Sequence, residues 1–282
     1  MTNRIALVTG ANTGIGLETA RGLAEAGMAV VMTARTRSKG EAAVADVQAS
    51  TGSDAVELLD LDLSSLENVR AAAAEFLSRY DRLDLLVNNA GLIMDERRLT
   101  QDGFEVTFGV NHLGPYLLTE LLLDALKAGA PSRIVNVASG AHVASRGLDF
   151  EDLMYERRKY TAMKAYGDSK LANILHALEL SGRLEGTGVS TYAVHPGAVG
   201  TNFGQDGDTS GIFPALFRFA RPLLRTPAKG AATSLYVATS DEVADQSGDY
   251  YANRKRKRAS RSARDVAAAE RLHAVSAALV GR

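Results

Sequence analysis

Residues 4–16 read RIALVTGANTGIG: a short apolar run, then a turn with three glycines, which leads into the amphipathic stretch 16–26. A strand followed at once by a glycine-rich turn and a helix is typical of the start of a βαβ unit. Glycines let the backbone turn tightly and approach a pyrophosphate closely, and a helix N-terminus favours the anion. We therefore expect a phosphate-binding loop here, with a glycine-rich turn that binds nothing as the alternative.

The same alternation of apolar runs with longer Ala- and Leu-rich stretches continues along the chain. Strands are predicted at 4–9, 29–34, 55–61, 83–88, 133–138 and 189–195, and helices at 16–26, 38–50, 66–80, 103–127, 162–184, 228–239 and 263–280. Near-continuous apolar strands indicate a sheet that is buried on both faces, and short connections indicate right-handed crossovers. The sequence therefore predicts an α/β fold: one domain, 1–282, with a doubly wound, Rossmann-type parallel sheet and helices on both faces.

Two long connections interrupt this alternation, at 140–160 and 202–227. Both follow predicted strands at their carboxyl ends, where ligands bind in open parallel sheets. The second connection is rich in apolar side chains, namely Phe203, Ile212, Phe213, Leu216, Phe217, Phe219, Leu223 and Leu224. We expect it to form a substrate lid, and its apolar character favours a lipophilic substrate.

Composition and charge exclude several classes of protein. Of 282 residues, 46% are hydrophobic and 23% charged, which is ordinary for a globular chain. The absence of cysteine excludes disulfides, thiolate metal sites and a cysteine nucleophile. Seven cations and no acidic residue occupy 254–264, so a net charge of −1 leaves −8 on the remainder. One basic patch on an acidic body does not indicate a nucleic-acid-binding protein; a solvated patch, or one facing an anionic surface, is the favoured reading, and nucleic-acid binding stays open as the alternative.

Hydropathy and histidine spacing bear on location and metal binding. No window approaches 18 consecutive apolar residues, and the first apolar run begins at Ile5. We therefore expect no integral membrane segment and no secretory signal, and a cytoplasmic protein. The histidines show no metal-ligand spacing and are expected to be core or surface residues, with His195 a candidate pocket residue: His112, His142, His176, His195 and His273.

Further short motifs follow the glycine-rich turn in a fixed order: Asn88-Asn89-Ala90-Gly91, Asn111, Ser139, Tyr166-x-x-x-Lys170 and Pro196-Gly197. Together with residues 9–16 they make the chain resemble the short-chain dehydrogenase/reductase family over essentially its whole length. The segments LVNNAG (86–91), GVNHLG (109–114), PSRIVNVAS (131–139), DSKLANIL (168–175) and TYAVHPG (191–197) resemble its retinol dehydrogenase-like branch. The resemblance implies an oxidoreductase with a nicotinamide cofactor, and a homo-oligomer.

The resemblance also implies which residues hold the cofactor. They are Gly10, Asn12, Thr13, Gly14, Ile15, Gly16, Arg35, Asp62, Leu63, Asn89, Ala90, Gly91, Tyr166, Lys170, Pro196, Gly197, Val199 and Thr201. Asp62 matches the residue that contacts adenine in the family, and it could also act as a helix N-terminal carboxylate. Asn89 and its neighbours are expected to support the strand end and the adenine-ribose edge.

The choice between NAD and NADP depends on the end of the second predicted strand. An acidic residue about 20 positions past the loop would bind the ribose of NAD, but Ala34 stands there and Arg35 follows. Arg35 would instead hold a 2′-phosphate through charge-assisted hydrogen bonds. The prediction is NADP(H), with a solvated basic loop as the alternative.

The predicted reacting groups are Asn111, Ser139, Tyr166 and Lys170. Tyr166 and Lys170 share a helix face because they are four residues apart. An ammonium and a positive nicotinamide would lower the pKa of Tyr166 towards neutrality, so that it exchanges a proton with a carbonyl or alcohol. The resemblance implies that Ser139 bonds the substrate oxygen and that Asn111 holds a water in a proton relay.

Taken together, these residues predict an NADP-dependent oxidoreductase that transfers hydride between nicotinamide and a lipophilic alcohol or carbonyl. The alternative is a catalytically inactive, nucleotide-sensing regulator of the same fold.

Overall fold

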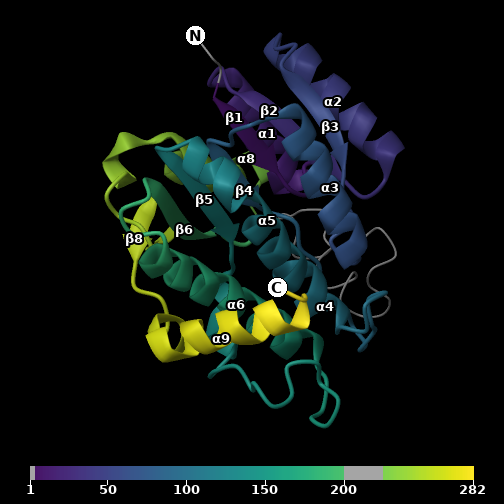
Figure 1. The fold of residues 1–282 in the computed structure, drawn as a ribbon, viewed down its shortest axis with the longest axis vertical. Coiled ribbons are helices and arrows are strands. Elements are labelled where there is room, and N and C mark those ends of the chain that lie inside the picture. Colours follow the sequence, from purple (N-terminus) through teal and green to yellow (C-terminus); the bar gives the residue numbers. More distant parts are fainter. Residues whose placement is uncertain (1–3, 200–224) are drawn as a thin grey trace.

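In the computed structural model, which describes residues 4–199 and 225–282, eight strands form one sheet in the order β3-β2-β1-β4-β5-β6-β7-β8 (Figure 1). The first six strands are parallel: β1 (Ile5–Val8), β2 (Ala29–Ala34), β3 (Val56–Asp60), β4 (Leu85–Asn88), β5 (Ser132–Val137) and β6 (Val189–His195). Each lies within about two residues of a predicted strand. From β1 the strands are added first towards one edge of the sheet, as β2 and β3, and then towards the other edge, starting with β4. This change in strand order at β1 confirms the doubly wound fold.

Helices cover both faces of this sheet (Figure 1). One core packs against α1 (Gly14–Glu25), α2 (Arg37–Thr51) and α8 (Pro227–Thr239). The other packs against α3 (Leu66–Arg79), α5 (Gly114–Ala128), α6 (Ala162–Arg183) and α9 (Val266–Leu279). Strand side chains alternate between the cores, as where Leu7 enters the second core and Val8 the first.

Two short strands at the sheet edge were not predicted. β7 (Tyr250–Ala252) runs parallel to β6, and β8 (Lys255–Lys257) returns antiparallel through a two-residue turn. Asn253 and Arg254 form that turn with positive φ angles of 55° and 56°, as tight hairpins require. β8 is exposed at every position and lacks apolar alternation, so hydropathy gave no signal for it.

The helix predicted at 103–127 is divided at its start. A short α4 (Val106–Phe108) leads into a π-helical turn η1 (Gly109–Leu113), and only then does α5 begin. Close packing explains the glycines at both ends of the turn. A Cβ atom at Gly109 would lie 2.8 Å from Thr100, and one at Gly114 would lie 2.6 Å from the carbonyl oxygen of Leu63. Such π turns interrupt the regular helical face and often occur at functional sites.

The remaining expectations concern the connections and the membrane. Residues 202–224 of the predicted lid, with its apolar side chains, and Thr201 lie outside the described residues. Arg225 pairs with Val199 in an isolated parallel bridge just before α8. Among residues 4–199 and 225–282, no helix is both long and apolar enough to cross a bilayer.

Candidate active site

The glycine-rich loop between β1 and α1 forms a cradle that side chains would fill. A Cβ atom at Gly10 would lie 3.0 Å from Ala90, and one at Gly16 would lie 2.3 Å from the carbonyl oxygen of Gly10. Gly10 and Gly14 have φ angles of 61° and 59°, which disfavour other residues. The first turn of α1 carries no acidic side chain, and Thr13 makes no side-chain cap bond there. This backbone fits a pyrophosphate held at a helix N-terminus.

Residues that follow β4 hold the glycine-rich loop in place through hydrogen bonds. The Thr9 hydroxyl accepts hydrogen bonds from the Asn89 and Ala90 N–H groups at 2.9 and 3.0 Å. The Asn89 amide donates to the carbonyl oxygens of Thr9 and Gly10 at 2.8 and 3.2 Å. The structure therefore brings Asn89 and Ala90 against the loop, where they support its shape, while Asn12 is partly exposed on it.

The carboxyl ends of β2 and β3 lie beside this cradle. Arg35 is exposed directly after Ala34, which faces Asp60 in the parallel register. Arg37 pairs with Asp60 at 2.8 Å and with Glu41 at 3.0 Å. Counting along the chain missed the Asp60 carboxylate because it comes from the neighbouring strand.

The predicted adenine residues follow β3. The Asp62 carboxylate accepts hydrogen bonds from the Ser64 backbone and hydroxyl at 2.9 and 2.7 Å, which fixes the turn. Leu63 is buried beneath it, with its backbone against Gly114 of α5.

The loop after β6 meets the cradle at α8. A Cβ atom at Gly230 would lie 2.8 Å from Val199 and 3.0 Å from Ile15, so these two predicted cofactor residues converge on one glycine. Gly197, which follows Pro196, has a φ angle of 90°. The turn therefore presents backbone rather than a side chain at this position.

The four predicted reacting residues come together at the ends of β4 and β5. A Cβ atom at Gly91 would lie 3.1 Å from Lys170 Nζ and 3.2 Å from Asn111 Oδ1. Lys170 Nζ lies 5.5 Å from the centre of the Tyr166 ring and donates to the Val137 carbonyl oxygen at 2.9 Å.

Ser139 completes the group, because its hydroxyl is hydrogen-bonded to the Tyr166 phenol. A serine, a phenol and a buried ammonium thus adjoin the glycine cradle, which is an arrangement that can exchange a proton with a bound oxygen.

Asn111 is fully engaged by the protein. Its Oδ1 accepts from the Leu92 N–H at 2.7 Å, and its Nδ2 donates to the Leu92 carbonyl and the Ser169 hydroxyl, each at 2.9 Å. Both amide hydrogens are used, so the Asn111 side chain joins the loop after β4 to α6. A water relay through its amide nitrogen does not fit this geometry.

The expected depression of the Tyr166 pKa concerns the complex with a positive nicotinamide, and the protein alone shows a different balance. Burial raises the pKa of Tyr166 to about 12, against a weaker opposing effect of the Ser139 hydrogen bond. Burial also lowers the pKa of Lys170 to about 8. Desolvation disfavours the charged form of each group, so burial shifts the two pKa values in opposite directions.

Two histidines lie beside Ser139: His195, which was predicted as a candidate pocket residue, and His142, which was not. His195 Nδ1 accepts hydrogen bonds from the Gly140 and Gly197 N–H groups at 3.1 and 3.3 Å. His142, from the short helix η2 (Gly140–Ala144), has its Nδ1 2.7 Å from the Ser139 carbonyl oxygen. The Pro-Gly turn after His195 was a signal for a nearby pocket, but a contact across 55 residues is not visible in sequence.

Asp168, two residues after Tyr166, anchors the long connection predicted at 140–160 onto α6. Its nearly buried carboxylate binds four side chains: Ser145 at 2.5 Å, Tyr155 at 2.7 Å, Arg158 at 3.2 Å and Lys164 at 2.5 Å. This hub explains how an irregular segment holds a defined position beside the reacting residues. Nothing in the sequence separated Asp168 from other helix-surface carboxylates.

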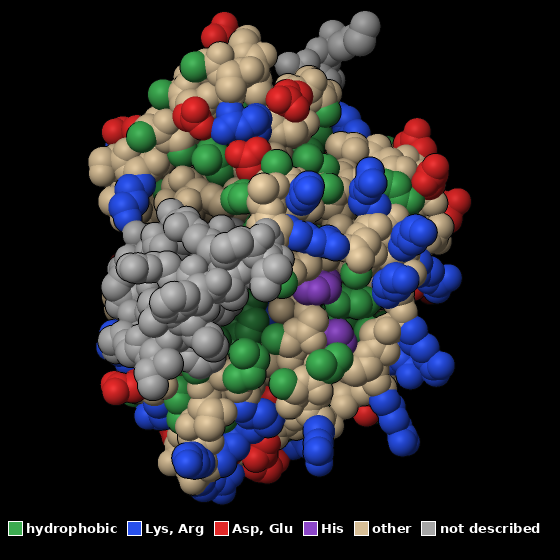
Figure 2. All heavy atoms as spheres, turned by 180° about the vertical axis from the view of Figure 1, so that it is seen from behind, with side chains coloured by type: hydrophobic (Ala, Val, Ile, Leu, Met, Phe, Trp, Pro, Cys, Tyr) green, Lys and Arg blue, Asp and Glu red, His purple; other side chains and the backbone are tan. Residues whose placement is uncertain are grey.

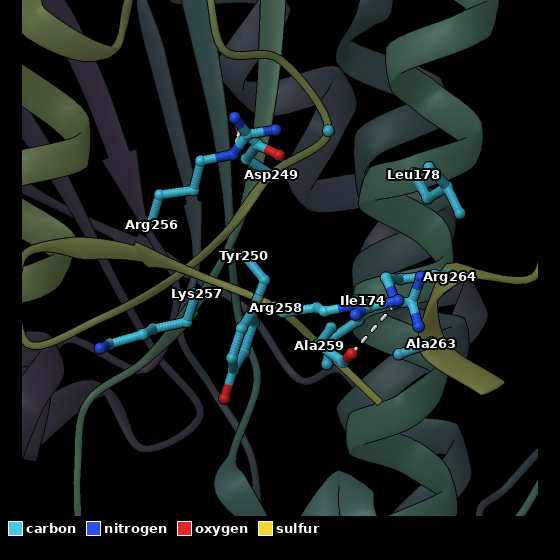
Figure 3. Close-up of a pocket in the computed structure, with 11 residues that line it drawn as sticks. Ile174, Leu178, Asp249, Tyr250, Arg256, Lys257, Arg258, Ala259, Ala263 and Arg264 are labelled. Atoms are coloured by element: carbon cyan, nitrogen blue, oxygen red, sulfur yellow. Dashed lines mark hydrogen bonds and ion pairs between the residues drawn. The ribbon is translucent and has the colours of Figure 1, made fainter. Parts of the chain in front are cut away.

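The basic run 254–264 borders a separate pocket of about 380 Å³ between α6 and the β7–β8 hairpin (Figure 3). Its apolar wall includes Ile174, Leu178 and Tyr250, whereas Arg256 lies beside Asp249 at 2.6 Å. Lys and Arg side chains gather along the edge of the molecule on which β8 lies (Figure 2).

No group of three His, Asp or Glu side chains in the described ranges is arranged to hold a metal ion.

The chain is similar to known proteins over most of its length. Residues 4–149 match the family model described as short chain dehydrogenase. The chain is 45% identical to human retinol dehydrogenase 13 over 281 residues, covering 98% of this chain and 84% of that protein. It is also 45% identical to human retinol dehydrogenase 12 over 278 residues, covering 99% of this chain and 86% of that protein.

Solved structures are similar over the same extent. A putative uncharacterized protein from Mycobacterium paratuberculosis aligns with a TM-score of 0.79 and 35% identity, covering 99% of this chain and 93% of that one. The Pseudomonas aeruginosa RhlG/NADP active-site complex aligns with a TM-score of 0.70 and 26% identity, covering 88% of this chain and 94% of that one.

Proposed function

The chain belongs to the short-chain dehydrogenase family and is a nicotinamide-dependent oxidoreductase, and from that premise we propose that it transfers hydride between NADP(H) and a lipophilic carbonyl or alcohol. The observation that carries the proposal is the hydrogen-bonded Ser139–Tyr166 pair, with Lys170 beside it, at the rim of the glycine cradle. A nucleotide-sensing regulator without catalysis is less favoured, because it would have no use for this group.

Each reacting residue has a different role towards the oxygen atom of the substrate. Bound nicotinamide supplies or accepts the hydride. Ser139 donates a hydrogen bond to the substrate oxygen, and Tyr166 gives that oxygen its proton or removes it. Lys170, held by the Val137 carbonyl, places a buried positive charge next to the phenol. That charge stabilises the phenolate formed when Tyr166 gives up its proton.

The protonation state of Tyr166 favours one direction near neutral pH. Because burial raises the pKa of this phenol to about 12, it remains protonated at pH 7. A protonated phenol is a general acid, which reduction of a carbonyl requires. Oxidation of an alcohol requires the phenolate, so its rate is expected to rise with pH.

The choice of NADP is supported by the end of β2. Ala34 stands where NAD-binding chains carry an acidic residue, and Arg35 follows on the surface. The nearest carboxylate in the strand register, Asp60, is paired with Arg37. The solved RhlG complex, a structural relative, contains NADP.

The lipophilic substrate class is supported by exposed apolar side chains close in sequence to the reacting residues. Val143 and Met163 are 66% and 45% exposed, four residues after Ser139 and three before Tyr166. The sequence of 202–227 adds further apolar residues after β6. Two relatives are named as retinol dehydrogenases.

The test combines cofactor preference with a substrate series. Arg35→Ala should weaken NADPH binding by about 1.5–3 kcal/mol, as for a lost charged hydrogen bond, and leave NADH binding nearly unchanged. Lys255→Ala, on the opposite sheet edge, is the control for removal of a surface cation. Isothermal titration measures both, and a wild-type preference for NADH would contradict the NADP proposal.

The same preparation tests the substrate class by NADPH absorbance. Catalytic efficiency on straight-chain aldehydes should rise with length, by up to about 0.8 kcal/mol for each buried methylene. A flat series, or a preference for small charged sugars, contradicts the lipophilic class. Absence of turnover with every carbonyl and alcohol tested would favour the regulator.

A further inference from the structure

Two imidazoles hold opposite ends of a single peptide group next to the catalytic serine. The carbonyl oxygen of Ser139 lies 2.7 Å from His142 Nδ1, and the N–H of Gly140 donates to His195 Nδ1 at 3.1 Å. These atoms belong to the same Ser139–Gly140 peptide plane. Its orientation sets the direction of the Ser139 side chain, which is bonded to Tyr166.

The contacts dictate the protonation of each ring. His195 Nδ1 accepts from two N–H groups, those of Gly140 and Gly197, so it cannot carry a hydrogen. His142 Nε2 accepts from the Ser260 N–H at 3.3 Å, so its hydrogen is on Nδ1 and is donated to Ser139. Both rings are therefore neutral and have opposite tautomers.

We propose that His142 and His195 are positioning residues that act only as neutral imidazoles, and that they fix the Ser139–Gly140 peptide for catalysis. His195 does more than orient the serine, because the same nitrogen holds Gly197 in the turn expected to face the nicotinamide. One acceptor thus links the serine loop to the cofactor turn. The inference rests on the proposed function, since it concerns how that reaction is supported.

The surroundings of the pair favour the neutral state. Burial and the positive charge of Arg225 lower the pKa of His195, and burial lowers the pKa of His142. Within the described ranges, the titratable and charged groups facing the pair are Arg225 beside Gly197, Tyr250 of β7 and Tyr166 beyond Ser139. The Tyr250 ring lies 5.3 Å from that of His142, so the wall of the pocket in Figure 3 also supports this histidine.

Protonation of His195 would break its hydrogen bonds to the backbone. A proton on His195 Nδ1 would face the Gly140 and Gly197 hydrogens, so both bonds would be lost together. We expect turnover to fall as the pH drops through the pKa of His195, which lies below the ordinary histidine value of about 6.5. At pH 8 His195 is neutral, and both of its hydrogen bonds to the backbone are intact.

The experiment uses two substitutions at position 195. His195→Leu removes the acceptor of two partly buried N–H groups, and turnover at pH 8 should fall between about five-fold and 150-fold, the range for donors that lose their partner. His195→Asn returns an acceptor oxygen near the Nδ1 position that does not titrate in this range. It should recover most of the turnover that the leucine variant loses, and its loss of turnover below pH 6.5 should be smaller than in the wild type.

A matched pair of variants tests the other ring. His142→Asn can keep an amide donor for the Ser139 carbonyl but loses Ser260, whereas His142→Gln can reach Ser260 but not Ser139. We expect the asparagine variant to retain more turnover than the glutamine variant. Equal losses in the two would overturn a specific role of the bond to Ser139.

Imidazole ¹⁵N spectra of the wild type give a readout that is independent of activity. They should show His195 with its hydrogen on Nε2 and His142 with its hydrogen on Nδ1. A hydrogen on His195 Nδ1 at pH 8, or identical pH profiles for wild type and His195→Asn, would overturn the inference. Absence of turnover in the wild type with the expected spectra would instead contradict the proposed function.

Discussion

The two helical layers on either side of the sheet are built differently. In the layer of α1, α2 and α8, the buried polar side chains are hydroxyls, such as Thr19, Thr233 and Ser234. The layer of α3, α5, α6 and α9, with the turn η1 that precedes α5, buries groups that can carry charge, among them His112, His176 and Lys170. The first layer contributes close backbone packing at Gly16 and Gly230, and the second contributes titratable side chains.

The first layer therefore contributes to cofactor binding and the second to the reaction. A cofactor cradle made of backbone keeps its shape over a wide range of pH, because peptide groups do not titrate. The reacting side depends on groups whose protonation must be correct, and burial shifts the pKa of each. Substitutions in the two layers should therefore fail in different ways.

The largest effect is expected on the reacting side. Tyr166→Phe removes the phenol oxygen but keeps the ring, so turnover should fall by roughly 10²–10⁴, as for a lost general acid–base. NADPH affinity should stay close to that of the wild type, because the cradle around Gly16 is unchanged. Steady-state kinetics beside fluorescence titration of NADPH separate the two effects. Near-wild-type turnover in this variant would refute the role of Tyr166.

An intermediate effect is expected on the binding side. Gly16→Ala places a Cβ atom 2.3 Å from the carbonyl oxygen of Gly10, so the backbone must shift. Overpacking of this kind costs about 1–3 kcal/mol, and NADPH affinity should fall with it. Gly182→Ala in α6 is the control, since a Cβ atom there meets nothing within 4 Å. That control should be neutral, or stabilising by up to about 1 kcal/mol, in urea unfolding.

The smallest effect concerns the acid stability of the second layer. Burial lowers the pKa of His112 to about 3 and that of His176 well below 6.5, so each ring takes up a proton on unfolding below that pH. The contribution of the two neutral rings to the free energy of unfolding is complete above pH 6.5. It is lost as the pH falls towards their folded-state pKa values, by about 1 kcal/mol per pH unit for each ring.

The check is urea unfolding between pH 8 and 5. His176→Leu removes a buried imidazole whose Nε2 has no hydrogen-bond partner among the described residues. The free energy of unfolding should then depend less steeply on pH, by the contribution of one ring. An unchanged slope in that variant would contradict the argument.

The parts of the fold also differ in how well the sequence predicts them. The glycine-rich loop and β1–β6 were predictable because tight turns and buried strands restrict the residue types along the chain. The π-helical turn at Gly109–Leu113 was not, since apolar spacing does not distinguish it from the helix that follows. β8 was missed because Lys255–Lys257 has no buried face.

The sequence predicted which residues belong to the site, but it did not predict their burial or their hydrogen-bond partners. Motif spacing predicted that Asn111, Ser139, Tyr166 and Lys170 belong together, and the structure places them close to one another. The raised pKa of Tyr166 depends on burial, which appears only after the chain has folded. The bonds of His195 likewise join residues distant in sequence, so they required the fold.

The outermost strand carries a consequence for self-association. An unpaired strand edge invites a second copy to extend the sheet, which is a common route to aggregation. Here the edge presents Lys255–Lys257, every residue of which is exposed. Two copies that met along this edge would bring together Lys255 and Lys257 of each copy, whereas Arg256 is already paired with Asp249. Electrostatic repulsion between these lysines therefore disfavours extension of the sheet by a second copy at this edge.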